Sequence, residues 1–441
     1  MEAVTINTED EKRQTLSRWL QYGCLLVLAL MEIVYFLLEY RANGIAYTYI
    51  ESYAIMFAMI FAGVTLTMPM SRQMKRLFTI PLGMILWLCV SRTVHRVGGG
   101  VEASEISSYV CAYALLLPFA SATRDGTRQW GMKLYAGVFA AMGVLLIAYC
   151  LMLIGNVLPE YLREGVRWNG FRFNAMGHPN ACAGLLILAM GATLYLLATL
   201  RKLWPRVLLA VLAVGEFVVL MLTNSRTTVT FACVLIGGSV FCALRKTGWK
   251  RLIAAGLAAL LVMGGLFIGS QKLTEKRSAQ VEATSGTQVL KESGQRSLET
   301  DMKTLNGRTR IWRAAIAGLE DNPGIKYVGA DYPWLILSQH GADAYNTHNS
   351  WLETLYEWGA PALLGALILT VLAVYDSLVI LWYNRNLNRS IVALLVLCFL
   401  GCAMLETYLF HGGVFYHPYN FFFMLCLGYL DCWRAELREA K

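Results

Sequence analysis

The chain has 441 residues, of which 57% are hydrophobic and only 15% are charged, and its formal net charge is +9. Soluble domains carry about 25% charged residues, so this composition excludes an ordinary soluble protein and indicates an integral membrane protein. A basic excess is expected of the cytoplasmic loops of such a protein, and no nucleic-acid-binding motif accompanies it. The eleven cysteines include no CxxC pair, which argues against disulfides and a cysteine metal site.

Apolar runs long enough to cross a bilayer recur along the chain. A helical span needs about 20 apolar residues, and the runs predict spans at residues 20–40, 46–68, 78–97, 104–121, 132–155, 179–199, 206–223, 227–244, 252–269, 360–382, 391–410 and 414–432. The sequence therefore predicts an all-α integral membrane protein with about twelve transmembrane helices and one large external loop that carries short amphipathic helices.

The distribution of basic residues predicts how these spans are oriented. Lysine and arginine gather in alternate connections, such as 201–206 and 245–251, while the connections between them are leaner. The positive-inside rule then places both termini in the cytoplasm. We expect residues 1–269 to form spans one to nine, 270–359 to form the large external catalytic loop, and 360–441 to form spans ten to twelve and a cytoplasmic tail.

The large external loop has two halves of different character. Residues 274–303 are polar and poor in apolar side chains, which is typical of a mobile or extended segment. Between Ile311 and Leu319 apolar residues recur at helical spacing before a Pro-Gly stop signal, so we expect an amphipathic helix there. A short helix is predicted from Trp351 to Trp358, with Ser350 and Glu353 as a capping box.

Two arginines on the external side are candidates for binding an anion. Arg226 lies in a connection so short that its side chain must sit near the membrane boundary. A guanidinium binds phosphate oxygens through paired hydrogen bonds; the alternative is an arginine that only snorkels to the interface. Arg308, beside Arg310 and Arg313, would supply the second cation that a pyrophosphate needs, unless this cluster is simply a solvated face.

His348 is the candidate general base, because it lies just before or at a helix start. The positive end of a helix dipole disfavours imidazolium, and a neutral imidazole can accept a proton; the alternative is a histidine bonded to loop backbone. Arg167 and Arg172 would add to an anion site or lie in a solvated loop. His178 and Asn180 are explained as helix-start residues before and after a proline.

Further ionisable residues lie within the apolar runs without an assigned role. Such groups are costly in a membrane and face the interior or pair with one another; here they are Glu32, Arg92, His95, Arg96, Glu216 and Glu406. Arg92, His95 and Arg96 recur at helical spacing and would face a lipid-phosphate groove or pair with Glu32 or Glu216. No nucleotide-binding loop, zinc helix or nucleophile elbow is present in the sequence.

Several short motifs occur in a fixed order between about residues 160 and 365. They are Arg167…Gly170 with Gly177-His178-Pro179-Asn180, Ser225-Arg226-Thr227, Gly307-Arg308 with Trp312 and Asn322-Pro323-Gly324…Gly329, and His348-Asn349-Ser350-Trp351-Leu352-Glu353…Glu357-Trp358-Gly359. In these motifs the chain resembles the bacterial O-antigen ligase and O-antigen polymerase superfamily of membrane glycosyltransferases. One departure is Gly359-Ala360-Pro361, where that family often continues with Gly-Leu and a second glycine.

The resemblance implies a metal-independent, inverting transfer of a glycan from undecaprenyl pyrophosphate to an acceptor sugar hydroxyl, at the outer face of the bacterial cytoplasmic membrane. Arg226 and Arg308 would hold the pyrophosphate leaving group and His348 would activate the acceptor. The candidate substrate-binding residues are Arg167, Arg172, His178, Asn180 and Asn349. No cofactor is expected, and the expected partners are the lipid-linked donor, a glycan or glycolipid acceptor and membrane lipid.

Other functions remain open from the sequence. A polymerase of the same superfamily shares these motifs, and a lipid-linked glycan transporter would also have about twelve spans. An oligosaccharyltransferase-like enzyme would need acidic residues in the first external connection, and residues 41–44 contain none. A non-catalytic assembly protein would bind glycan through the same loop without turnover.

Overall fold

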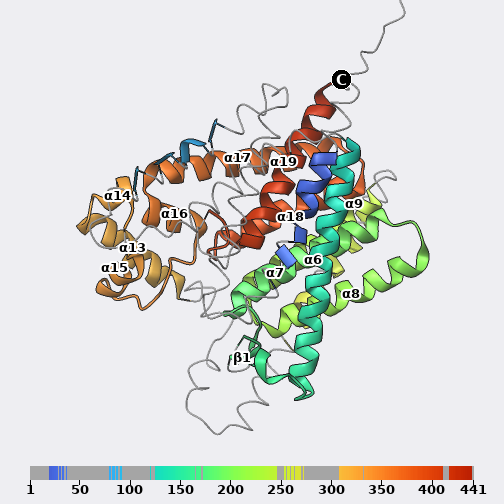
Figure 1. Ribbon diagram of the computed structural model, residues 1–441, viewed down its shortest axis with the longest axis horizontal. Helices are drawn as coiled ribbons and strands as arrows, with labels where there is room; N and C mark the ends of the chain where they lie inside the picture. Colours follow the sequence, from blue (N-terminus) through green and yellow to red (C-terminus); the bar gives the residue numbers. More distant parts are fainter. Residues whose placement is uncertain are drawn as a thin grey trace, which may run out of the picture.

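The computed structural model describes residues 125–245, 307–410 and 417–439 with single gaps at 164, 170, 171 and 331, and scattered positions within 19–36, 79–91, 120 and 253–272. These residues are mostly helical (Figure 1). The long helices are α6 (Asp125–Ile154), α7 (Pro179–Thr199), α8 (Leu203–Leu222), α9 (Arg226–Leu244), α17 (Ala360–Tyr383), α18 (Leu387–Ala403) and α19 (His417–Glu439). The shorter elements are η2 (Glu160–Leu162), β1 (Arg167–Asn169), β2 (Arg172–Asn174), α13 (Arg308–Asp321), α14 (Ile325–Val328), α15 (Pro333–Gln339) and α16 (Ser350–Trp358).

Five helices in the described part of the chain are long and apolar enough to cross a membrane: α6, α7, α8, α9 and α17. They lie where spans were predicted, although α6 begins at Asp125 rather than at residue 132. The described positions within predicted spans 20–40, 78–97 and 252–269 are also helical. Predicted span 46–68, span 104–121 apart from Ala120, and the polar segment 274–303 lie outside the described residues, as do Arg92, His95 and Arg96.

The predicted span 391–410 is wrong at its end, because α18 stops at Ala403. The following segment is not helical, and two of its backbone N–H groups bond to side chains instead of to a preceding turn. Leu409 N–H donates to Ser350 Oγ at 3.0 Å, and Phe410 N–H donates to Asn420 Oδ1 at 3.3 Å. These side chains satisfy backbone groups that would otherwise be costly to bury, so an apolar run can leave the helix here.

The prediction of an all-helical chain missed one small element. Strands β1 and β2 form an antiparallel pair in which Arg167 lies opposite Asn174 and Asn169 lies opposite Arg172. Each strand has three residues, which is too short to produce a period-two pattern in the sequence. The pair places the Arg172 side chain beside the start of α7.

Helix α7 lies at the centre of the bundle and packs against α6, α8 and α18, while α9 also packs on α18. Most of its side chains are buried, and many are alanine, glycine or cysteine. Small residues allow helices to approach closely within a membrane. The beginning of α7 is therefore held in the middle of one end of the bundle, near several of the candidate site residues.

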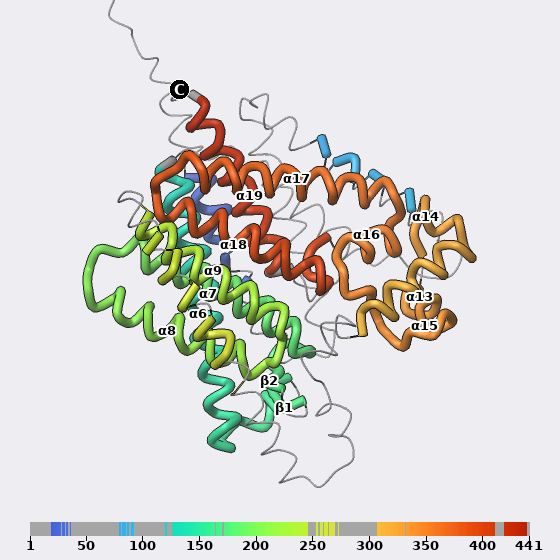
Figure 2. Tube along the Cα trace, turned by 180° about the vertical axis from the view of Figure 1, so that it is seen from behind, coloured from blue at the N-terminus to red at the C-terminus, as the bar shows by residue number. Residues whose placement is uncertain are grey.

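A second, smaller core lies beside this bundle and is built by helices α13 to α16, here called the cap (Figures 1 and 2). The predicted amphipathic helix is confirmed as α13, which buries Ala314, Ala315 and Leu319 along one face. These side chains pack with Leu337 of α15 and Tyr356 of α16. The cap thus has its own apolar centre, and α16 continues directly into α17 of the bundle.

Two glycines allow close backbone contacts at the junction between the cap and α17. Gly329 and Gly359 both have positive φ, at +81° and +82°. A Cβ on Gly329 would lie 2.0 Å from the Glu357 carbonyl oxygen, and one on Gly359 would lie 2.0 Å from the Tyr327 carbonyl oxygen. Only glycine permits both this backbone conformation and this close approach. The junction is closed by Ala330 N–H, which donates to the Tyr356 carbonyl at 2.8 Å.

The other end of the bundle carries a separate set of ion pairs. Arg128 at the start of α6 and Arg389 at the start of α18 both contact Glu436, at 2.8 Å and 3.0 Å. Arg434 contacts Asp376 at 2.5 Å and also pairs with Asp431. Connections that the sequence places on one side of the membrane therefore do meet at one end of the bundle, opposite the cap and the start of α7.

Candidate active site

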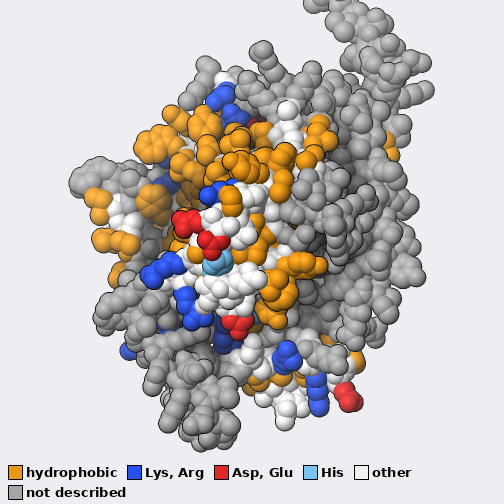
Figure 3. All heavy atoms as spheres, turned by 90° about the vertical axis from the view of Figure 1, so that its left-hand side faces the viewer, with side chains coloured by type: hydrophobic (Ala, Val, Ile, Leu, Met, Phe, Trp, Pro, Cys, Tyr) orange, Lys and Arg blue, Asp and Glu red, His pale blue; other side chains and the backbone are white. Residues whose placement is uncertain are grey.

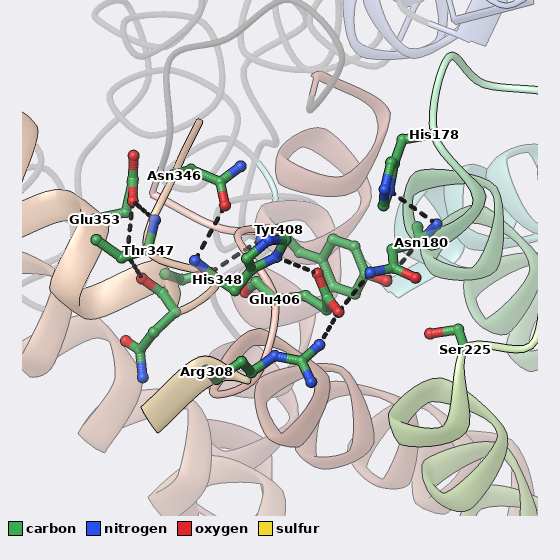
Figure 4. Close-up of polar contacts among 12 residues, drawn as sticks. His178, Asn180, Ser225, Arg308, Asn346, Thr347, His348, Glu353, Glu406 and Tyr408 are labelled. Carbon is green, nitrogen blue, oxygen red and sulfur yellow. Dashed lines mark hydrogen bonds and ion pairs between the residues drawn. The ribbon is translucent and has the colours of Figure 1, made fainter. Parts of the chain in front are cut away.

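The candidate site lies where the cap meets the bundle, and its centre is the carboxylate of Glu406 (Figure 4). Glu406 follows the end of α18 and is only 3% exposed. Its Oε2 lies 3.0 Å from His348 Nδ1, and its Oε1 forms an ion pair with Arg308. The same Oε1 accepts a hydrogen bond from Asn180 Nδ2 at 2.7 Å. Four segments that are far apart in the sequence therefore meet at one side chain.

Arg308 is the first residue of α13, and only 7% of it is exposed. The alternative of a solvated basic face does not describe it, whereas the neighbouring Arg310 and Arg313 are exposed. An isolated buried guanidinium is very costly, and the Glu406 carboxylate offsets that cost. The helix start therefore points a charged donor group toward the bundle rather than toward solvent.

The loop before α16 fixes His348 in an unusual backbone conformation. His348 has φ of +49°, and its N–H donates to Asn346 Oδ1 at 3.0 Å. Thr347 is hydrogen-bonded to both α16 and α13. Its N–H and Oγ1 donate to Glu353 Oε2 at 2.5 Å and 2.6 Å. Its carbonyl accepts from Trp312 Nε1 of α13 at 2.9 Å. The imidazole is thus carried by a rigid turn that both α13 and α16 brace.

The predicted capping box of α16 is wrong. The N-cap is Asn349, whose Oδ1 accepts from the N–H groups of Trp351 and Leu352 at 3.0 Å and 2.9 Å. Its Nδ2 donates to the Met404 carbonyl at 2.9 Å. These contacts give Asn349 a structural role, while its predicted part in substrate binding stays a prediction. Ser350 instead faces the segment after α18, and its Oγ donates to the Glu406 carbonyl at 3.1 Å.

Residues from the β-hairpin and the start of α7 extend the network. Arg172 donates from NH2 to Asn180 Oδ1 and from Nε to the Thr223 carbonyl at 2.8 Å. Asn180 therefore joins Arg172 to Glu406. Arg167, in contrast, lies exposed on β1, and no contact joins it to this network among the described residues.

His178 caps α7, as the helix-start interpretation predicted. Its Nδ1 accepts from Asn180 N–H at 3.2 Å, which requires an unprotonated nitrogen. Desolvation by the surrounding protein and then the charge of Arg172 lower the pKa of His178 to about 4. The ring is therefore neutral at neutral pH and serves the helix start.

Arg226 is the first residue of α9 and is partly exposed. The same helical turn carries Thr228, whose Oγ1 lies 3.4 Å from the Tyr408 hydroxyl, two residues from Glu406. Tyr408 in turn donates from its hydroxyl to the Asn180 carbonyl at 2.6 Å. The start of α9 is thus at the site, but side chains two positions apart on a helix do not face the same way.

Burial alone would raise the pKa of the Glu406 carboxyl. The hydrogen bond with His348 and the positive charge of Arg308 outweigh burial, so the net pKa lies below the ordinary 4.5. Glu406 is therefore a carboxylate at neutral pH. An ionised carboxylate only accepts hydrogen bonds, so the facing Nδ1 of His348 carries a proton.

Residues 213–367 match a family model described as O-antigen ligase. The chain carries an O-antigen ligase domain. This confirms the resemblance drawn from the short motifs, because the match contains Arg226, Arg308 and His348. No curated protein matches the chain. Asn180 and Glu406 lie outside the O-antigen ligase domain, yet they contact its residues directly.

Glu406 is the residue that sequence reasoning missed. It was noted only as one of several ionisable groups in apolar runs, and it stands in a stretch that was predicted to be a span. The available signal was its position near the end of that run, next to Thr407 and Tyr408. The end of the molecule that carries the cap presents charged side chains of both signs and a histidine among hydrophobic ones (Figure 3).

Proposed function

We propose that the protein is a membrane glycosyltransferase that moves a glycan from undecaprenyl pyrophosphate to an acceptor sugar hydroxyl. The observation that carries this is the convergence of Arg308 and His348 on Glu406, at the junction of cap and bundle. Membership of the O-antigen ligase superfamily supports a lipid-linked glycan and an acceptor as its substrates in general terms.

The donor end of the site uses positive groups. Loss of the pyrophosphate leaving group develops negative charge, which preorganised guanidinium groups stabilise. Arg308 supplies one such group, and Arg226 supplies the second at the start of α9, whose N-cap Ser225 makes no side-chain capping bond. Helix starts present backbone N–H groups that favour phosphate. Arg226 and these N–H groups would together receive the second phosphate.

The acceptor end uses His348. With Nδ1 protonated toward Glu406, the opposite nitrogen Nε2 keeps its lone pair. That nitrogen takes the proton of the acceptor hydroxyl as the oxygen attacks the anomeric carbon. Attack on the face opposite the leaving pyrophosphate inverts the anomeric configuration. Arg172, Asn180 and Arg167 are the remaining candidates for contacts with the phosphates or the sugar.

The test is transfer from a purified lipid-pyrophosphate glycan by the reconstituted protein, with EDTA present throughout. We expect His348→Ala and Arg226→Ala to lose most transfer, and transfer by the parent protein to survive EDTA. Two matched controls remove the same side-chain types elsewhere in the cap. They are His340→Ala at the end of α15 and Arg313→Ala, which is exposed on α13. Equal losses in controls and site variants would contradict the assigned roles.

Two acceptors separate the two enzymes of this superfamily. Transfer to a lipid A core defines a ligase, whereas growth of a second lipid-linked glycan defines a polymerase. A protein that moves the intact donor across a vesicle membrane without cleaving it would instead be a transporter.

We also propose that the cap faces the outside of the bacterial cytoplasmic membrane and that both termini face the cytoplasm. Tyr345 in the cap is 89% exposed, and Arg438 near the opposite end of the bundle is also exposed. A membrane-impermeant thiol reagent should label Tyr345→Cys in intact spheroplasts and label Arg438→Cys only after lysis. The reverse pattern would invert the proposed topology.

A further inference from the structure

Glu406 is a buried carboxylate that contacts several candidate site residues, unlike a charge on the surface. It is 3% exposed, and its two carboxylate oxygens face different partners. Oε2 faces His348, while Oε1 faces Arg308 and Asn180. Its backbone is fixed as well, because the Glu406 carbonyl accepts from Ser350 Oγ. The carboxylate therefore has little freedom to turn away from the imidazole.

We infer that Glu406 is a positioning residue that fixes the proton of His348 on Nδ1 and stabilises the imidazolium formed when Nε2 accepts the acceptor proton. This role rests on the proposed function and adds a residue outside the matched domain to its machinery. A carboxylate behind a histidine orients the ring and supports the charged form, as second-shell partners of histidine do elsewhere.

The proposed step balances around this arrangement. The acceptor oxygen forms a bond to the anomeric carbon while the bond from that carbon to the pyrophosphate oxygen breaks. The electron pair of the broken bond stays with the pyrophosphate, whose new charge faces Arg308. The acceptor proton moves to His348 Nε2, and Glu406 stays ionised. One carboxylate thus borders both the proton-accepting group and the group that neutralises the leaving anion.

A purely structural role is the competing explanation, and the chain supplies a matched control for it. Glu353 is also buried, at 1% exposed, and it braces the same loop by accepting from Thr347. Glu353→Gln would loosen the loop without changing a partner of the imidazole. A merely structural Glu406 would therefore respond to substitution as Glu353 does.

The experiment compares Glu406→Gln, Glu406→Asp and Glu353→Gln in the transfer assay across pH. In Glu406→Gln the amide N–H₂ can donate to Nδ1 and stabilise the wrong tautomer, so we expect turnover to fall on the order of 10²- to 10⁴-fold. The acid limb of its pH profile should move to lower pH, because an imidazolium without a facing carboxylate loses its proton more easily. Glu406→Asp should recover part of the turnover.

The other charged and titratable groups that face Glu406 and His348 are not substituted in any of the three variants. They are Arg308 of α13, Arg172 of the hairpin, His178 before α7, Cys402 of α18 and Tyr408 beyond it. A change in the profile of Glu406→Gln is therefore assignable to the carboxylate. A uniform loss at every pH, matching Glu353→Gln, or full activity in Glu406→Gln would overturn the inference.

A second readout does not depend on glycan transfer. Diethyl pyrocarbonate acylates neutral imidazole, and mass spectrometry of the peptide that contains His348 gives its modification rate at each pH. The rate profile of Glu406→Gln should move to lower pH relative to the parent protein and to Glu353→Gln. If the modification profile shifts but the protein shows no transfer, the proposed function is refuted and the positioning role of Glu406 is supported. If transfer occurs but the modification profile does not shift, only the positioning role is refuted.

Discussion

Replacing Ser350 with alanine should remove the hydroxyl that joins α16 to the segment after α18. Ser350 Oγ accepts from the N–H groups of Tyr408 and Leu409, both at 3.0 Å, and donates to the Glu406 carbonyl at 3.1 Å. Tyr408 N–H also reaches the Glu406 carbonyl at 3.2 Å. The Leu409 N–H is therefore the group that the substitution would leave without an acceptor.

The expected cost follows from these contacts. An orphaned buried group costs about 1–3 kcal/mol and each further lost hydrogen bond costs about 0.5–1.5 kcal/mol, so Ser350→Ala should destabilise the protein by roughly 3 kcal/mol. For a chain of this size, that corresponds to a fall in the melting temperature of roughly 3 °C. Transfer should fall further than the folded fraction does, because the Glu406 carbonyl loses its hydrogen bond to α16.

Thermal unfolding in detergent, followed by tryptophan fluorescence, measures this effect. Ser239→Ala is the matched control, since Ser239 is also buried but donates only to the Leu235 carbonyl within α9, at 2.7 Å. We expect the control to change the free energy of unfolding by less than about 1 kcal/mol. Equal melting temperatures for the two variants would refute the view that this hydroxyl anchors the site.

Three further predictions concern the same junction. Gly359→Ala forces a side chain into positive φ and against the Tyr327 carbonyl, so it should destabilise the protein by at least about 2 kcal/mol in the same unfolding assay, whereas an unchanged melting temperature would mean that the junction adapts. Arg308→Lys keeps a charge but loses the planar guanidinium, and should lower transfer roughly 10- to 100-fold; parent-like initial rates would show that a point charge suffices. Because the pKa of Glu406 is depressed below 4.5 in the folded protein, its stabilising effect is complete above that pH and is lost as the pH falls through the folded value. The parent should therefore lose stability in acid more steeply than Glu406→Gln, and parallel curves would contradict this linkage.

The membrane helices were predictable because their signal is local. Apolar runs of sufficient length, bounded by a proline or polar residues, located α7, α9 and α17 to within a few residues. The same local rule failed after Ala403, where the run stays apolar but the backbone leaves the helix. Its departure depends on Ser350 and Asn420, which supply hydrogen bonds from elsewhere in the chain. Ser350 lies 59 positions from Leu409 along the chain, outside any local window around the run.

The candidate site was predictable in its parts but not in its assembly. Arg308 was selected as a second cation for a pyrophosphate and His348 as a titratable residue at a helix start, and both are at the candidate site. Their common partner lies 98 and 58 positions away along the chain, and single-sequence patterns do not encode such pairings. The N-terminal capping residue of α16 was predicted wrongly for a different reason. Asn349 and Ser350 are both good N-cap residues, and the tertiary contact of Ser350 decided between them.

The ion pair between Arg308 and Glu406 is poorly explained as a device for stability. Burying two opposite charges costs hydration that their attraction only partly offsets, and apolar replacements of such pairs are often neutral or stabilising. Here the pair lies at the boundary between two separate cores, and Nδ1 of His348 contacts the same carboxylate. Arg308 and His348 come from the cap, whereas Glu406 and Asn180 come from the bundle. We interpret the buried charges as retained for chemistry, since the arrangement is complete only when the cap is docked on the bundle and is lost when either core moves.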